Sequence, residues 1–73
     1  MSLSKLELKL RVEARIHEIK AQLATLAADT TGEAQKRKQQ LEASLKEAER
    51  EIKAGWDKIT DQAVSKLNEW LKK

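Results

Sequence analysis

His17 is the residue best suited to acid–base chemistry in this 73-residue chain, because it alone titrates near neutrality without help from its surroundings. Glu13 lies four residues before it and Glu18 directly after it, so a carboxylate could pair with the imidazole on one helix. The segment 17–21, His-Glu-Ile-Lys-Ala, lacks the second His of a metalloprotease helix. With one His and no Cys, ligands for a transition metal or a thiolate zinc site are scarce. We therefore predict no catalytic, metal or cofactor-binding residue and no enzymatic activity.

A basic cluster, Lys36-Arg37-Lys38, is the second candidate for chemistry, because neighbouring cations can bind phosphates. No aromatic side chain lies near it to stack on bases, and Glu33 precedes Arg37 by the four residues that allow an ion pair on a helix. The formal net charge of +3 is modest. These features favour a solvated helix surface, and we do not expect nucleic acid as a partner.

The composition predicts an all-α protein. Strong helix formers dominate, charged residues make up 37% of the chain, and Pro, Phe and Tyr are absent. A chain this short has a marginal core, and without disulfides or a metal the usual addition is oligomerisation. No apolar run approaches the ~20 residues that span a bilayer, and the N-terminus carries no secretory signal, so we expect a cytoplasmic protein.

The first helix is expected over residues 3–28. Its apolar stripe has a mean step near 3.6 and comprises Leu8, Val12, Ile16, Ile19, Leu23 and Leu26. Apolar and polar residues also alternate strictly from Leu6 to Ile16, which by itself would suggest a strand. On a helix, these residues occupy more than one face, so we expect this segment to contact more than one partner element.

A turn is expected over residues 29–32, where Asp29, two Thr and Gly32 form a turn-type cluster. Thr30 followed by Glu33 matches a capping box, in which each side chain satisfies the backbone N–H of the other. The chain should therefore fold back here and start its second helix at residue 33. A single continuous helix is the alternative, since one Gly costs only about 1 kcal/mol in a helix interior.

The second helix is expected to run unbroken over residues 33–72. Its apolar residues repeat every eleven positions, as in Leu45, Trp56 and Leu67, and keep their phase across Gly55. This predicts a two-helix antiparallel hairpin of coiled-coil type with a long second helix, all in one domain, associating into a helical bundle. A three-helix bundle broken at Gly55 remains the alternative.

In such a hairpin the apolar tail from Trp56 to Leu71 extends beyond the first helix and must be covered by something else. We expect a homo-oligomer, with a dimer favoured, in which each tail packs on the first helix of its partner. The predicted oligomer interface comprises Leu3, Leu6, Leu10, Trp56, Ile59, Ala63, Leu67, Trp70 and Leu71.

The segment Glu49–Ile59 (EREIKAGWDKI), which follows a helix rich in Lys, Glu and Ala, resembles a loose group of short bacterial coiled-coil proteins of unknown function. This resemblance covers the last half of the chain and implies a bacterial source and a helical fold. It implies no functional residues, because the group has no established activity.

The function predicted from these features is that of a structural or interaction protein that self-associates through the apolar stripe with the eleven-residue repeat. Two alternatives stay open. The amphipathic tail, with Trp near both ends and Lys72-Lys73 after it, could lie on a membrane surface as a peripheral lipid-binding helix. It could also dock on another protein, as an adaptor.

Overall fold

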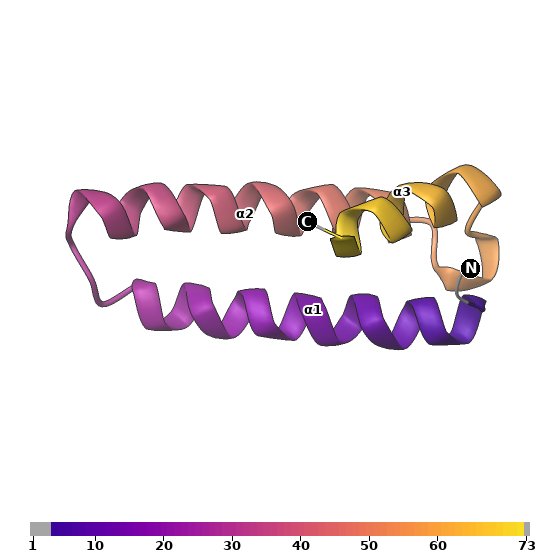
Figure 1. The fold of residues 1–73 in the computed structure, drawn as a ribbon, viewed down its shortest axis with the longest axis horizontal. Coiled ribbons are helices and arrows are strands. Elements are labelled where there is room, and N and C mark those ends of the chain that lie inside the picture. Colours follow the sequence, from indigo (N-terminus) through magenta and orange to yellow (C-terminus); the bar gives the residue numbers. More distant parts are fainter. Residues whose placement is uncertain (1–3, 73) are drawn as a thin grey trace.

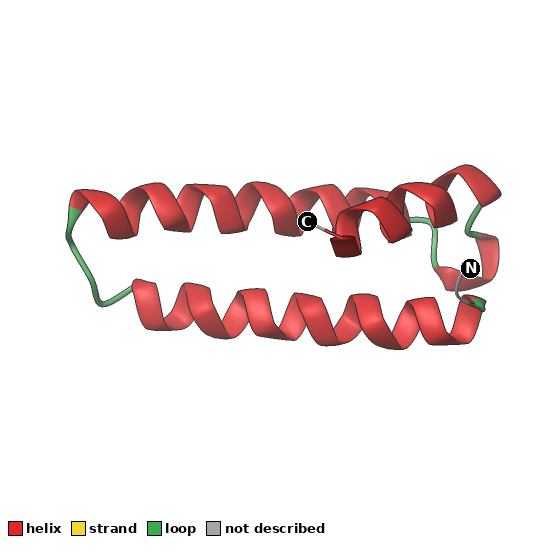
Figure 2. Ribbon diagram, viewed as in Figure 1, coloured by secondary structure: helices red, strands yellow, loops and turns green. Residues whose placement is uncertain are grey.

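The computed structural model describes residues 4–72 and shows three helices packed together. Helix α1 spans Lys5–Leu26, α2 spans Gly32–Ile52 and α3 spans Asp61–Lys72, with a short 3-10 helix, η1, at Trp56–Lys58 (Figures 1 and 2). The bundle is elongated, 40 × 21 × 16 Å. The all-α prediction is confirmed: every regular element in residues 4–72 is helical.

Helix α1 begins at a side-chain cap. Ser4 has an extended backbone, and its hydroxyl oxygen accepts a hydrogen bond from the backbone N–H of Glu7 at 3.2 Å. Such a cap satisfies one of the N–H groups that a helix start leaves without an intrahelical partner. The expected apolar stripe faces inward: Leu8, Val12 and Ile19 are buried, and Ile16, Leu23 and Leu26 pack against them.

The connection between α1 and α2 covers residues 27–31, and its cap differs from the expected one. The Asp29 carboxylate accepts a hydrogen bond from the backbone N–H of Thr31 at 3.0 Å. The Thr31 hydroxyl in turn accepts from the N–H of Ala34 at 3.2 Å, so Thr31 is the N-cap. The capping box predicted at Thr30 and Glu33 is therefore wrong by one residue, because the Asp29 turn places Thr31 in the extended conformation that a cap needs.

The unbroken second helix over residues 33–72 is also wrong. Helix α2 ends at Ile52, and the backbone N–H of Gly55 donates to the carbonyl of Ile52 at 2.9 Å. Gly55 has φ of 95°, in the region that only glycine enters without strain. The chain then passes through η1 and starts α3 at Asp61, where the Thr60 hydroxyl accepts from the N–H of Ala63 at 3.1 Å.

The predicted two-helix hairpin is consequently corrected to a three-helix bundle. Helix α3 runs back along α2 and contacts both other helices (Figure 1). The eleven-residue spacing of apolar residues continues across Gly55, but it does not require a continuous helix. Helix α3 can pack on the hairpin through its own buried residues, Ala63, Leu67 and Trp70. The tail is thus covered by its own chain, and the reason for expecting an overhang no longer holds.

The core lies where the three helices meet. Its buried members come from all three helices: Leu8, Val12, Ile19, Leu41, Ala48, Leu67 and Trp70. Trp56 and Ile59, from the connection before α3, pack against its edge. None of the helices within residues 4–72 is both long and apolar enough to cross a lipid bilayer.

Candidate interaction surface

The residues considered for acid–base chemistry lie on the surface of α1. His17 is exposed, and Glu18 forms an ion pair with Arg15 at 3.8 Å rather than with the imidazole. Within residues 4–72, no group of three or more His, Asp or Glu side chains is placed to hold a metal ion. The described surface around His17 therefore shows the features of a solvated helix face.

The basic cluster lies in the first two turns of α2. Lys36 and Arg37 are exposed and Lys38 is half-buried. Consecutive helix residues point about 100° apart, so these three cations do not converge on one phosphate. Arg37 instead borders a shallow hollow, next to Leu26 and Thr25 of α1.

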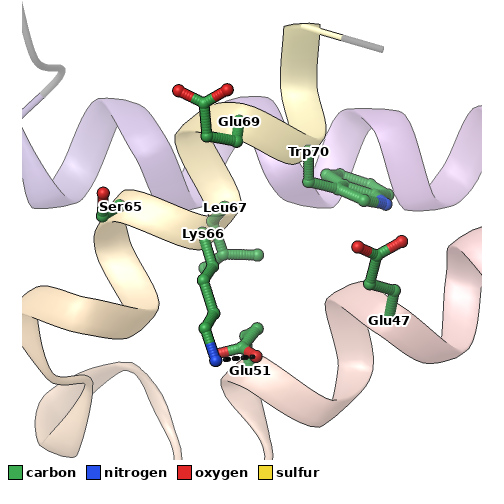
Figure 3. A pocket seen from close by; sticks show the side chains of 7 residues that line it. All are labelled: Glu47, Glu51, Ser65, Lys66, Leu67, Glu69 and Trp70. Carbon is green, nitrogen blue, oxygen red and sulfur yellow. Dashed lines mark ion pairs between the residues drawn. The ribbon is translucent and has the colours of Figure 1, made fainter.

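A second hollow, of about 200 Å³, lies between α2 and α3 and is lined by both polar and apolar groups (Figure 3). The Lys66 ammonium is 3.7 Å from the Glu51 carboxylate and connects the two helices. Glu69, on α3, is 3.5 Å from the ammonium of Lys72. In Figure 3 the Lys66–Glu51 pair lies between α2 and α3, Glu69 points away from α2, and the indole of Trp70 lies on the side of Glu47.

The residues predicted for an oligomer interface fall into separate groups. Ala63, Leu67 and Trp70 are buried inside the bundle of their own chain. Trp56, Ile59 and Leu71 are half-buried at its edge. Leu6 and Leu10 are 66% and 58% exposed, the large hydrophobic side chains most open to solvent in residues 4–72. Leu3 lies outside the described residues.

Leu6 and Leu10 belong to a longer line of residues along α1, which we call the outer stripe. Its members follow one another at steps of three or four and are all exposed: Leu6, Leu10, Ala14, His17, Ala21 and Ala24. At 100° per residue they lie opposite the buried stripe of Leu8, Val12 and Ile19. In Figure 1, α1 forms the lower long edge of the molecule, and both α2 and α3 lie above it.

The outer stripe was only partly visible in the sequence. The alternation from Leu6 to Ile16 indicated that α1 is apolar on more than one face, but Ala14, Ala21 and Ala24 were not assigned to a surface. The sequence signal for these alanines is the run of steps of four and three residues from Leu10 through His17 to Ala24, which places them on the side of the helix away from the core.

Two shallow hollows border the outer stripe. One lies beside Leu6 and is lined by Lys9 and Trp56. The other lies beside Ala14 and is lined by Arg11, Glu18 and Leu71. Half-buried Trp56 and Leu71, from the connection and from α3, therefore flank the exposed face of α1.

No protein-family model, curated protein or solved structure matches this chain. The segment Glu49–Ile59, on which the predicted resemblance to short bacterial coiled-coil proteins depends, contains the end of α2, the turn at Gly55 and η1. The surface of this chain is therefore the basis for any functional conclusion.

Proposed function

We propose that this protein is a non-enzymatic interaction protein that self-associates as a dimer through the outer stripe of α1. The observation that carries the proposal is the exposure of Leu6 and Leu10, one turn apart on a face of α1 that no other helix within residues 4–72 covers. Exposed contiguous apolar side chains on a small domain are typical of an interaction surface.

The energetics favour covering this face. Burying a large aliphatic side chain contributes about 1.5–3 kcal/mol, so covering what remains exposed of Leu6 or Leu10 contributes about 1–2 kcal/mol each. A dimer buries four such side chains. A single helix face is smaller than the ~800 Å² per partner of a standard stable interface, so we expect a dimer that dissociates on dilution.

The charges beside the outer stripe favour a second copy over an anionic membrane. The flanking positions carry two cations, Arg11 and Lys20, and three carboxylates, Glu7, Glu13 and Glu18. A membrane-binding helix has a predominantly basic polar face. The alternatives that used the tail for lipid or for a partner protein are also less favoured, because Leu67 and Trp70 already pack within the chain.

The test compares the wild type with a Leu6→Gln/Leu10→Gln double variant by size-exclusion chromatography with light scattering over a dilution series. We expect the wild type to approach twice the 8.3 kDa chain mass at high concentration. The variant should raise the dissociation constant by about a hundredfold or more, because the apolar contact is removed while both sites stay helical.

Lys46→Gln/Glu49→Gln is the matched control, since both residues are exposed on α2 and their loss leaves the net charge unchanged. This control should dimerise like the wild type. A wild type that keeps the monomer mass at every concentration would overturn the proposal, and so would a Leu6/Leu10 variant that dimerises unchanged.

A further inference from the structure

Building on the proposed self-association, we infer that two copies pair their α1 helices antiparallel, in one defined register, about a two-fold axis that passes between Arg15 and Ile16. The inference starts from the uneven distribution of side-chain size along the outer stripe. Its large members, Leu6 and Leu10, lie in the N-terminal half of α1, whereas Ala21 and Ala24 lie in the C-terminal half.

Antiparallel pairing matches large side chains with small ones. About this axis, Leu10 lies opposite Ala21 of the second copy, and Leu6 lies beside its Ala24. Ala14 lies opposite His17 of the second copy at the centre. Each leucine then fills the space left by an alanine, which allows the helices the 8–10 Å separation of ordinary helix packing. The two-fold axis makes every contact occur twice.

Charge complementarity supports the same register. Glu13 and Lys20 lie on one flank of the outer stripe, and Arg11 and Glu18 lie on the other. In an antiparallel pair each flank meets the same flank of the second copy, so Glu13 faces Lys20 of the second copy, within one helical turn. On the other flank, Arg11 faces Glu18 of the second copy in the same way. Because the two-fold axis repeats both pairs, four pairs of oppositely charged groups border the central part of the contact, over residues 11–20.

The surroundings of these groups leave them available. Arg11, Glu13 and Lys20 form no ion pair within residues 4–72, and Glu18 is paired only with exposed Arg15 of the same helix. Helix α3 approaches the flank of Arg11 and Glu18 through Leu71, whose half-buried side chain borders the same hollow.

A parallel pair fits this surface poorly. It places identical residues of the outer stripe opposite one another, so that Ala14 meets Ala14 and leaves a gap while Leu10 meets Leu10. Opposite flanks meet in a parallel pair, so that Glu13 lies beside Arg11 of the second copy and Lys20 lies beside its Glu18. Both pairs are oppositely charged, so the preference for the antiparallel arrangement rests on the match of large side chains with small ones.

Cysteine cross-linking tests the inference, and the chain offers a clean background because it contains no Cys. Leu10→Cys and Ala21→Cys are purified separately, mixed, and oxidised at a concentration where the wild type is dimeric. We expect disulfide-linked heterodimers of the two variants and only background cross-linking of either variant alone. Gln40→Cys, at an exposed position of α2, gives the background from random collision.

Glu13→Lys provides a second readout, which separates the two arrangements when it is compared with Glu13→Lys/Lys20→Glu. In the antiparallel register it sets two ammonium groups against each other, the introduced one and that of Lys20 of the second copy. The dissociation constant should then rise about tenfold, and Glu13→Lys/Lys20→Glu should restore it. In a parallel pair the second substitution would weaken binding further, because position 20 would then set a carboxylate beside Glu18 of the second copy.

Two results would overturn the antiparallel arrangement alone: efficient cross-linking of Leu10→Cys with itself, or weaker dimerisation of Glu13→Lys/Lys20→Glu than of Glu13→Lys. A wild type that is monomeric throughout would overturn the proposed self-association and, with it, this inference.

Discussion

The indole N–H of Trp70 donates to both the backbone carbonyl and the hydroxyl oxygen of Ser44, each at 3.0 Å, and so joins α3 to the middle of α2. The ring is 3% exposed and is part of the core. A buried indole N–H that finds a partner avoids the cost of an unsatisfied donor. This contact fixes where α3 lies along the hairpin.

Replacing Trp70 with Phe should destabilise the fold by about 1–3 kcal/mol, because it removes the hydrogen bonds to Ser44 and part of the buried ring. The measurement is urea unfolding followed by circular dichroism. Trp56→Phe is the control, since Trp56 is only half-buried and makes no side-chain hydrogen bond within residues 4–72. The free energy of unfolding should fall less in this control than in Trp70→Phe. Equal losses would contradict the placement of Trp70 against Ser44.

Gly55→Ala should destabilise by about 1 kcal/mol or more, because alanine is strained at φ of 95°. A Cβ at this position meets no atom within 4 Å, so the cost comes from the backbone alone. Gly32→Ala, also without a close neighbour but helical, should be neutral or stabilising. Thermal melts of both variants decide the point: stabilisation by Gly55→Ala would indicate a continuous helix through residue 55.

Thr31→Ala should cost about 1 kcal/mol, because the Thr31 hydroxyl caps α2 at the N–H of Ala34. Thr30→Ala is the matched control, being one residue earlier and exposed. It should be nearly neutral in the same chemical denaturation series. The reverse order of effects would place the cap at Thr30 instead.

The hydrogen bonds from the backbone N–H and the hydroxyl of Thr31 hold the pKa of the Asp29 carboxyl below its ordinary value. A lowered folded-state pKa means that the turn gains stability above the ordinary pKa and loses it as the pH falls through the lowered one. An NMR titration of the Asp29 side chain should show its pKa rising in Thr31→Ala, where only the hydroxyl is lost. Thr30→Ala should leave it unchanged; a rise there as well would assign the effect to general disturbance of the turn.

The helical nature of the chain and the inward face of α1 follow from the sequence, because steps of three and four between apolar residues such as Leu8 and Val12 report directly on a helix face. The break after Ile52 does not follow from the same signal. Helical spacing says nothing about a single backbone angle, and the positive φ of Gly55 lies within a pattern whose phase continues. The local sequence features that correspond to the break are Gly55, which can adopt a positive φ, and Thr60, which caps the start of α3.

The candidate surface was predictable only in part for a related reason. Leu6 and Leu10 stand out as apolar residues off the main stripe, but Trp70 and Leu67 look equally unpartnered until α3 folds back. Which apolar residues remain outside a small bundle depends on tertiary packing, and in this chain the packing depends on the break between α2 and α3 at Gly55.

The most direct test of the account is a dilution series of backbone amide chemical shifts on uniformly ¹⁵N-labelled wild-type protein. Self-association through α1 predicts concentration-dependent shifts that are largest around Leu10, Ala14 and Ala21, with the outward face of α3 around Ser65 unchanged. Shifts that stay constant at all residues over the whole series, or that are largest on α3, would contradict it.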